Sequence, residues 1–169
     1  SQMHNIYYTK TPNQTLAALA SFDFELPVTE GGVTFKSGEA QLTKTKLTTG
    51  ELWDVTSKSG DDDISYQIAS FAPELLATFT NADATATAMA GTVNGITYEG
   101  YGVNTAPKKV EGGLFMTSED LSAAIFIPNA QIFSNLVNEN DKPAYINSKV
   151  SALSDAAGKN IYVLFKKTV

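Results

Sequence analysis

The chain has 169 residues, of which 43% are hydrophobic and 18% are charged, which is enough apolar material for one compact domain with a core. It has no cysteine, which excludes disulfides, thiolate zinc sites and a cysteine nucleophile. The net charge is −6 and all 12 basic residues are lysine, so the bidentate arginine fork is absent and tight or sequence-specific nucleic-acid binding is disfavoured.

Two further absences limit the possible functions. The single histidine, His4, lies near the N-terminus, and this disfavours a Ser-His-Asp triad. No apolar run approaches the roughly 18 residues that a membrane span needs, so we expect no membrane partner.

The first part of the chain is predicted to be an irregular arm followed by strands. Residues 1–20 have little periodicity, and we expect an N-terminal arm that docks on a neighbour, ahead of a single domain over residues 21–169. Apolar and acidic side chains then alternate with a period of two, which predicts a half-buried strand at Phe22, Asp23, Phe24, Glu25 and Leu26. Pro27 ends this strand, and another begins at Val33.

The next segment is a long, mostly polar strand with a weak apolar face. Polar residues alternate with Ala40, Leu42, Lys44 and Lys46, a pattern that suits an exposed hairpin or a sheet edge. Lysine on an edge strand discourages uncontrolled pairing, yet such a strand can pair with a partner in an ordered assembly. Trp53 and Val55 share one face of the strand that follows.

A strand and a short helix come next. Ile64, Tyr66 and Ile68 alternate with polar residues and predict a strand. Pro73 and Glu74 suit the first turn of a helix over residues 73–80. Its apolar stripe is Leu75, Leu76 and Phe79. A helix of about two turns needs a sheet to pack against.

The second half of the chain is also predicted to be mainly β. Asn94-Gly95, between runs 85–93 and 96–103, is the strongest short-range hairpin signal. Strands are then predicted at 114–116 and 122–127, and Pro128-Asn129 is predicted to open a second short helix over 129–138. A closing hairpin is predicted from runs 145–153 and 160–166 across the Asp155–Gly158 turn. The predicted fold is therefore a single β-sandwich or barrel of about nine or ten antiparallel strands with one or two short flanking helices.

Two segments of the chain are weakly similar in sequence. Residues 63–81 and 120–138 are identical at 4 of 19 aligned positions, and each reads as a strand, a short helix and a polar exit. They are either two units built by the same packing rules or a pseudo-symmetric pair.

No constellation of residues predicts catalysis. Asp61-Asp62-Asp63 offers oxygen ligands for Ca²⁺ but lacks an EF-hand register, so a solvated loop is the preferred interpretation. No pair among the 18 acidic residues stands out as a glycosidase pair. Five aromatics form either a carbohydrate-stacking face or packing contacts: Trp53, Tyr66, Tyr98, Tyr101 and Tyr145. We therefore expect a non-enzyme without a cofactor or bound metal.

The order of elements resembles that of bacteriophage tail tube (major tail) proteins. The resemblance covers roughly Phe22 to Lys166. It rests on four motifs: the polar segment Gly38–Leu47, the strand Gly50–Val55, the strand Asp63–Ile68 and the helix start Pro73–Leu76. The second predicted strand-helix unit departs from the usual subunit, which has one principal helix.

The resemblance implies a structural role in the virion. Subunits of this family join their sheets into hexameric rings, and the rings stack into a tube with a usually acidic lumen through which DNA passes without specific binding. It implies a location in the virion tail after assembly in the host cytoplasm, with other tail proteins as further partners. The implied inter-subunit contacts are Glu39, Gln41, Leu42, Thr43, Lys44, Thr45, Lys46 and Leu47, together with the N-terminal arm.

The alternative is a secreted or cell-surface β-domain that binds a glycan or a protein partner. The tube interpretation predicts concentration-dependent rings or fibres from one purified chain. The alternative predicts a stable monomer whose melting temperature shifts with ligand.

Overall fold

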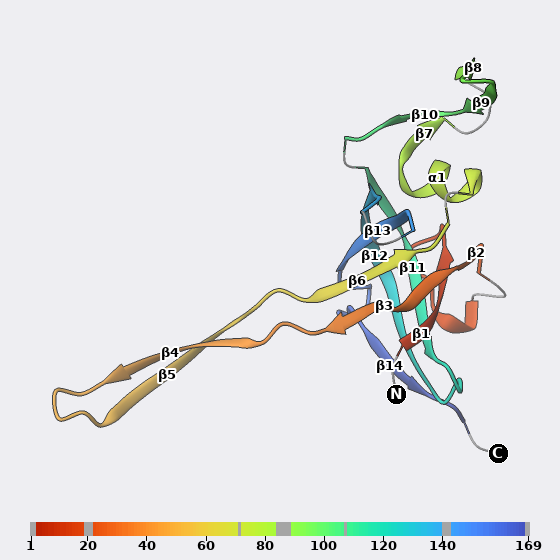
Figure 1. The fold of residues 1–169 in the computed structure, drawn as a ribbon. Helices are drawn as coiled ribbons and strands as arrows, with labels where there is room; N and C mark the ends of the chain where they lie inside the picture. Colours follow the sequence, from red (N-terminus) through yellow and green to blue (C-terminus); the bar gives the residue numbers. More distant parts are fainter. Residues whose placement is uncertain are drawn as a thin grey trace.

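The fold is mainly β, as the sequence predicts (Figure 1). The computed structural model describes residues 3–18, 22–70, 72–83, 89–106, 108–139 and 143–167. Within these ranges the helical elements are α1 (Pro73–Phe79) and a single 3₁₀ turn, Leu16–Ala18. The fold-class prediction is therefore confirmed, although its second helix is not.

An eight-stranded antiparallel sheet forms the body of the described part of the chain. Its path runs β2 (Phe24–Leu26), β1 (Met3–Thr9), β11 (Lys109–Ser118), β12 (Ala123–Val137), β13 (Tyr145–Ala152), β6 (Asp63–Ile68) and β3 (Val28–Lys36), with β14 (Tyr162–Phe165) also paired to β12. Strands β1 and β3 approach each other, so the sheet curls into a nearly closed barrel.

Three two-stranded ribbons complete the described strands. They are β4 (Ala40–Lys46) with β5 (Leu52–Ser59), β7 (Asn81–Asp83) with β10 (Gly102–Asn104), and β8 (Met89–Val93) with β9 (Ile96–Gly100). The β4–β5 ribbon extends far from the barrel, and the β8–β9 ribbon stands beyond α1 at another end of the molecule (Figure 1).

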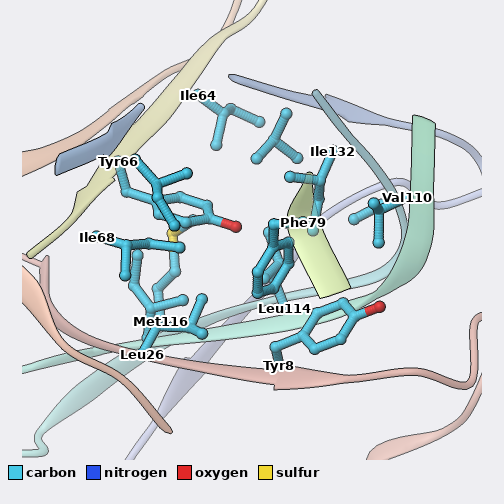
Figure 2. Close-up of a cluster of buried hydrophobic side chains, with 14 of the residues drawn as sticks. Tyr8, Leu26, Ile64, Tyr66, Ile68, Phe79, Val110, Leu114, Met116 and Ile132 are labelled. Carbon is cyan, nitrogen blue, oxygen red and sulfur yellow. The ribbon is translucent and has the colours of Figure 1, made fainter. Parts of the chain in front are cut away.

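The core fills the barrel interior. Alternate residues of the sheet strands point inward, as the period of two requires, and Figure 2 shows them meeting around Phe79. The fully buried apolar side chains include Ile6, Tyr66, Ile68, Leu114, Met116, Ile127, Ile132 and Ile146. Helix α1 contributes Leu75, Leu76 and Phe79, so its short length is compensated by packing against the sheet.

The predicted second helix over 129–138 is wrong, because these residues belong to β12. Residues 130–133 pair with β11 on one side and with β13 on the other. Pro128, which lacks an N–H group, lies where the β11–β12 register shifts between Gly112 and Leu114. Pro128-Asn129 therefore marks an irregularity in a long strand, and pairing across the sheet overrides the local helical spacing.

This correction also removes the predicted structural similarity between residues 63–81 and 120–138. Residues 63–81 form a strand, helix α1 and the short strand β7, whereas residues 123–137 form one uninterrupted strand. The two segments are therefore not copies of one strand-helix unit.

Two other expectations are corrected. The irregular arm is wrong for Met3–Thr9, which form β1 between β2 and β11. Residues 10–18 lie outside the sheet, and residues 1–2 and 19–20 of the predicted arm lie outside the described ranges. The closing hairpin is also wrong. Strands β13 and β14 pair not with each other but with successive parts of β12, and residues 153–161 loop out between them.

Candidate functional site

The β4–β5 hairpin is the most prominent feature outside the barrel. Strands β3 and β6 run on into β4 and β5, so the two ribbons form one long arm (Figure 1). At the junction the backbone N–H of Gly38 donates to Asp62 Oδ1 at 2.8 Å, and the N–H of Gly60 donates to the carbonyl of Glu39 at 2.8 Å. A Cβ on Gly38 would lie 2.0 Å from the Gly60 carbonyl oxygen. The close approach of the two strands therefore requires glycine there.

Every residue of β4 and β5 is exposed. The register places Leu42 opposite Ser57 and Lys44 opposite Val55 on one face, while Thr43 lies opposite Thr56 on the other. The large apolar side chains keep much of their surface in solvent: Leu42 is 59% exposed, Leu52 55%, Val55 43% and Trp53 70%. Trp53 lies at a shift in the register near the tip. The hairpin thus exposes several large apolar side chains, interleaved with lysine and serine, that nothing in the described chain covers.

The predicted contact residues lie on this hairpin and its turn. Glu39, Gln41, Leu42, Thr43, Lys44, Thr45, Lys46 and Leu47 are all exposed. Glu39 pairs with Lys36 at 3.0 Å, but both side chains are largely exposed and such a pair adds little stability. Exposure makes these residues available for contact, and their role between subunits stays a prediction.

The β8–β9 hairpin has a more complete apolar face, which the sequence analysis did not assign to any contact. The chain turns at Asn94 and Gly95, both with positive φ, as the sequence predicts. The pairs Val93–Ile96 and Gly91–Tyr98 share a face with Met89. These apolar side chains are strongly exposed: Met89 76%, Val93 60%, Ile96 56% and Tyr98 58%.

A groove on the outside of the barrel is also apolar. Its lining comes from β1, β11, β12 and β14 and from the segments at Leu16, Phe22 and Leu121, and its volume is about 510 Å³. Outward positions of a half-exposed sheet are normally polar. Here Tyr7, Phe22 and Phe115 instead form an aromatic cluster with ring centroids 5.5 to 6.3 Å apart. Sequence analysis missed this groove, because its lining comes from four strands distant in the chain.

The two loops beside the groove are held by aspartates. Asp120 accepts hydrogen bonds from the hydroxyls of Ser118 and Ser122, both at 2.7 Å, and from the Ser122 N–H at 3.1 Å. These bonds lower the pKa of Asp120 from 3.8 to about 2. Asp155 accepts a hydrogen bond from the Tyr162 hydroxyl, which lowers the pKa of the aspartate and raises that of the tyrosine. The Asp120 hydrogen bonds therefore hold the loop that brings Leu121 to the groove, whereas Asp155 and Tyr162 line a separate, smaller pocket.

The other candidate groups from the sequence, the five aromatics and the acidic residues, do not come together in a site. The five aromatics do not form one face, because Tyr66 and Tyr145 are buried while Trp53 and Tyr98 lie on different hairpins. No group of His, Asp and Glu residues in the described ranges is arranged to hold a metal ion. Among the described residues no helix has the length and apolar character to cross a membrane.

The fold and its surfaces define a class of protein: a nearly closed antiparallel β-barrel with two projecting apolar hairpins and an apolar groove. No family model matches the chain, and a search of curated proteins finds no match.

Proposed function

We propose that this chain is a structural subunit of a phage tail tube, which assembles with copies of itself into stacked rings around a channel for DNA. The observation that carries this proposal is the fully exposed β4–β5 hairpin with its uncovered large apolar side chains. A single two-stranded hairpin is marginally stable in water, and large exposed apolar patches mark interaction sites.

The accessible surface area of the chain supports a large interface with a partner. The chain exposes 11092 Å² of surface. A compact monomer of 18.1 kDa exposes about 8,100 Å² by the usual scaling of area with mass. The excess of about 3,000 Å² falls in the range that obligate interfaces bury.

Composition supports the proposed passage of DNA. DNA is a polyanion, and a chain with a net charge of −6 and no arginine offers few groups that would bind it. The hexameric ring comes from the family resemblance described above, as do the virion tail location, assembly in the host cytoplasm and contact with other tail proteins.

A second candidate function is a secreted or cell-surface domain that binds a glycan or a protein. The exposed rings of Trp53 and Tyr98 favour it, because aromatic side chains supply large, amphipathic contact area. This candidate requires a stable monomer.

The test is to replace residues 39–59 by an Asn-Gly turn and to follow assembly by sedimentation velocity. The proposal expects the replaced chain to keep its barrel, shown by an unchanged near-ultraviolet circular dichroism spectrum, and to stay monomeric where the full chain assembles. The matched control is Thr56→Ala, which changes only the polar face of the hairpin and is not one of the predicted contact residues. Assembly that survives the replacement would contradict the assignment of this hairpin.

A further inference from the structure

The chain contains one Asn-Gly pair, Asn94-Gly95, which forms the two-residue turn between β8 and β9. Both residues are exposed and both have positive φ, 51° at Asn94 and 78° at Gly95. A Cβ placed on Gly95 would meet nothing within 4 Å. The β8–β9 ribbon stands at one end of the molecule, beyond α1 (Figure 1). Solvent therefore reaches the turn without obstruction from the described chain.

Two groups in this turn can react with each other. They are the side-chain amide of Asn94 and the backbone N–H of Gly95, and neither makes a hydrogen bond with a described residue. A bond between the Gly95 nitrogen and Asn94 Cγ would close a five-membered ring, and such an intramolecular step avoids the entropy cost of bringing two molecules together. Glycine has no side chain to hinder the approach, so both reacting groups are available.

The other asparagines of the described chain differ from Asn94. Hydrogen bonds hold the side chains of seven of them: Asn5, Asn13, Asn81, Asn104, Asn129, Asn135 and Asn147. The other two, Asn138 and Asn160, are followed by Glu139 and Ile161, whose side chains hinder attack by the backbone nitrogen. Asn94 is therefore the described asparagine at which an unheld amide and a glycine nitrogen come together.

We propose that Asn94 is a site of spontaneous deamidation. The Gly95 nitrogen loses its proton to a solvent base and attacks Asn94 Cγ, so that an N–Cγ bond forms while the Cγ–Nδ2 bond breaks. The Nδ2 nitrogen takes up a proton and leaves as ammonia, and residues 94 and 95 are then joined in a succinimide ring. The reaction requires only water and no partner, so it goes beyond the proposed function and does not depend on it.

Water then opens the ring in one of two ways. Attack at Cγ breaks the new N–Cγ bond and gives aspartate. Attack at the backbone carbonyl carbon breaks the original peptide bond and gives isoaspartate, in which the chain runs through Cβ and Cγ. The overall change is one water taken up and one ammonia released. Either product has a carboxylate in place of a neutral amide, which makes the chain one unit more negative than its present −6.

The two products should affect the β8–β9 hairpin differently. Asp-Gly suits the same turn as Asn-Gly, so the aspartate product keeps the Val93–Ile96 pair and the ladder behind it. Isoaspartate lengthens the backbone of a two-residue turn whose length fixes the register. In the described sheets β8 and β9 pair only with each other, and an isolated two-stranded hairpin is marginally stable. The isoaspartyl product should therefore open the hairpin.

Peptide mapping by mass spectrometry tests the modification. The purified full-length chain is aged at mildly alkaline pH, which ionises more of the backbone N–H, and is sampled over time. We expect the peptide with residue 94 to become about 1 Da heavier and to separate into an aspartyl and an isoaspartyl form. The product there should exceed that at Asn129 or Asn147 at least about tenfold, because those amides are held by hydrogen bonds and lack a following glycine.

The matched control is Asn94→Gly, which removes the side-chain amide and keeps the turn, because Gly-Gly also suits two positive φ angles. This variant should show no change in mass in the same peptide. Equal product at Asn94 and Asn147 would overturn the inference. So would product at Asn94 that forms in urea but not in the folded chain, since the turn would then protect the amide.

Hydrogen exchange tests the effect on the hairpin. In the aged chain, exchange is read separately on the isoaspartyl and the unmodified peptides that cover β8 and β9. We expect the isoaspartyl form to lose protection, whereas Asn94→Asp, which has the same charge on an unaltered backbone, keeps the protection of the native chain. Equal protection in the isoaspartyl form and in Asn94→Asp would overturn the predicted opening. None of these readings depends on assembly, so their failure leaves the proposed function untouched.

Discussion

Truncation of Trp53 should separate assembly from folding. Trp53 is 70% exposed near the tip of the β4–β5 hairpin. Large aromatic side chains bury up to about 250 Å², so a neighbour covering this exposed part would bury about 175 Å². At about 25 cal/mol per Å² this burial contributes at most about 4 kcal/mol to association.

The measured effect will be smaller than this limit, because association also costs side-chain and rigid-body freedom. We expect Trp53→Ala to weaken assembly by about 2 to 3 kcal/mol, which is about a 30- to 150-fold rise in the concentration needed. The stability of the monomer should change by less than about 1 kcal/mol, because the side chain is outside the barrel core.

The assay is light scattering over a concentration series, with thermal unfolding of the same samples at low concentration. Thr56→Ala, on the polar face of the hairpin, is the matched control and should leave both readings unchanged. An unaltered assembly curve for Trp53→Ala would refute the argument. So would a fall of many degrees in the melting temperature of the monomer, since that would place Trp53 in the folded core.

The remaining predictions concern the barrel and its loops. Phe79→Ala should destabilise the protein by about 3 to 5 kcal/mol, because the buried ring packs at 5.0 Å on Tyr8 and leaves a cavity; chemical denaturation measures this. Gly112→Ala should cost about 1 to 3 kcal/mol in the same assay, because its Cβ would lie 2.3 Å from the Thr9 carbonyl oxygen, whereas Gly102→Ala meets nothing within 4 Å and should be neutral. The Asp120 pKa of about 2 lies below its ordinary 3.8, so the stabilisation is present above about pH 4 and is lost as the pH falls toward 2. Asp120→Asn should therefore flatten the fall in melting temperature across that window, and a fall as steep as that of the native chain would contradict the role of this carboxylate.

Locally encoded features could be predicted from the sequence. The Asn94-Gly95 turn and the start of α1 at Pro73 depend on the backbone preferences of a few neighbouring residues, and both are confirmed. The alternation in Asp63–Ile68 and the exposed character of Ala40–Lys46 follow in the same way from side-chain pattern.

Features that depend on distant pairing could not be predicted. Met3–Thr9 become a strand because β11, about 110 residues later, pairs with them. Residues 129–137 have a helix-like spacing, yet β11 and β13 hold residues 130–133 extended from both sides, and β13 alone pairs with residues 134–137. The groove is harder still to predict, since Tyr7, Phe115 and Leu164 meet only after the sheet has curled. The local sequence around each of these residues does not indicate that they line one groove.

The central claim is that the exposed β4–β5 hairpin of this chain is a contact between its copies. The most direct measurement is light scattering with negative-stain microscopy on the purified full-length chain over a wide range of concentration. We predict a rise in mass with concentration and the appearance of rings or stacked fibres. A strict monomer at the highest concentration, with no rings in the images, would contradict the claim.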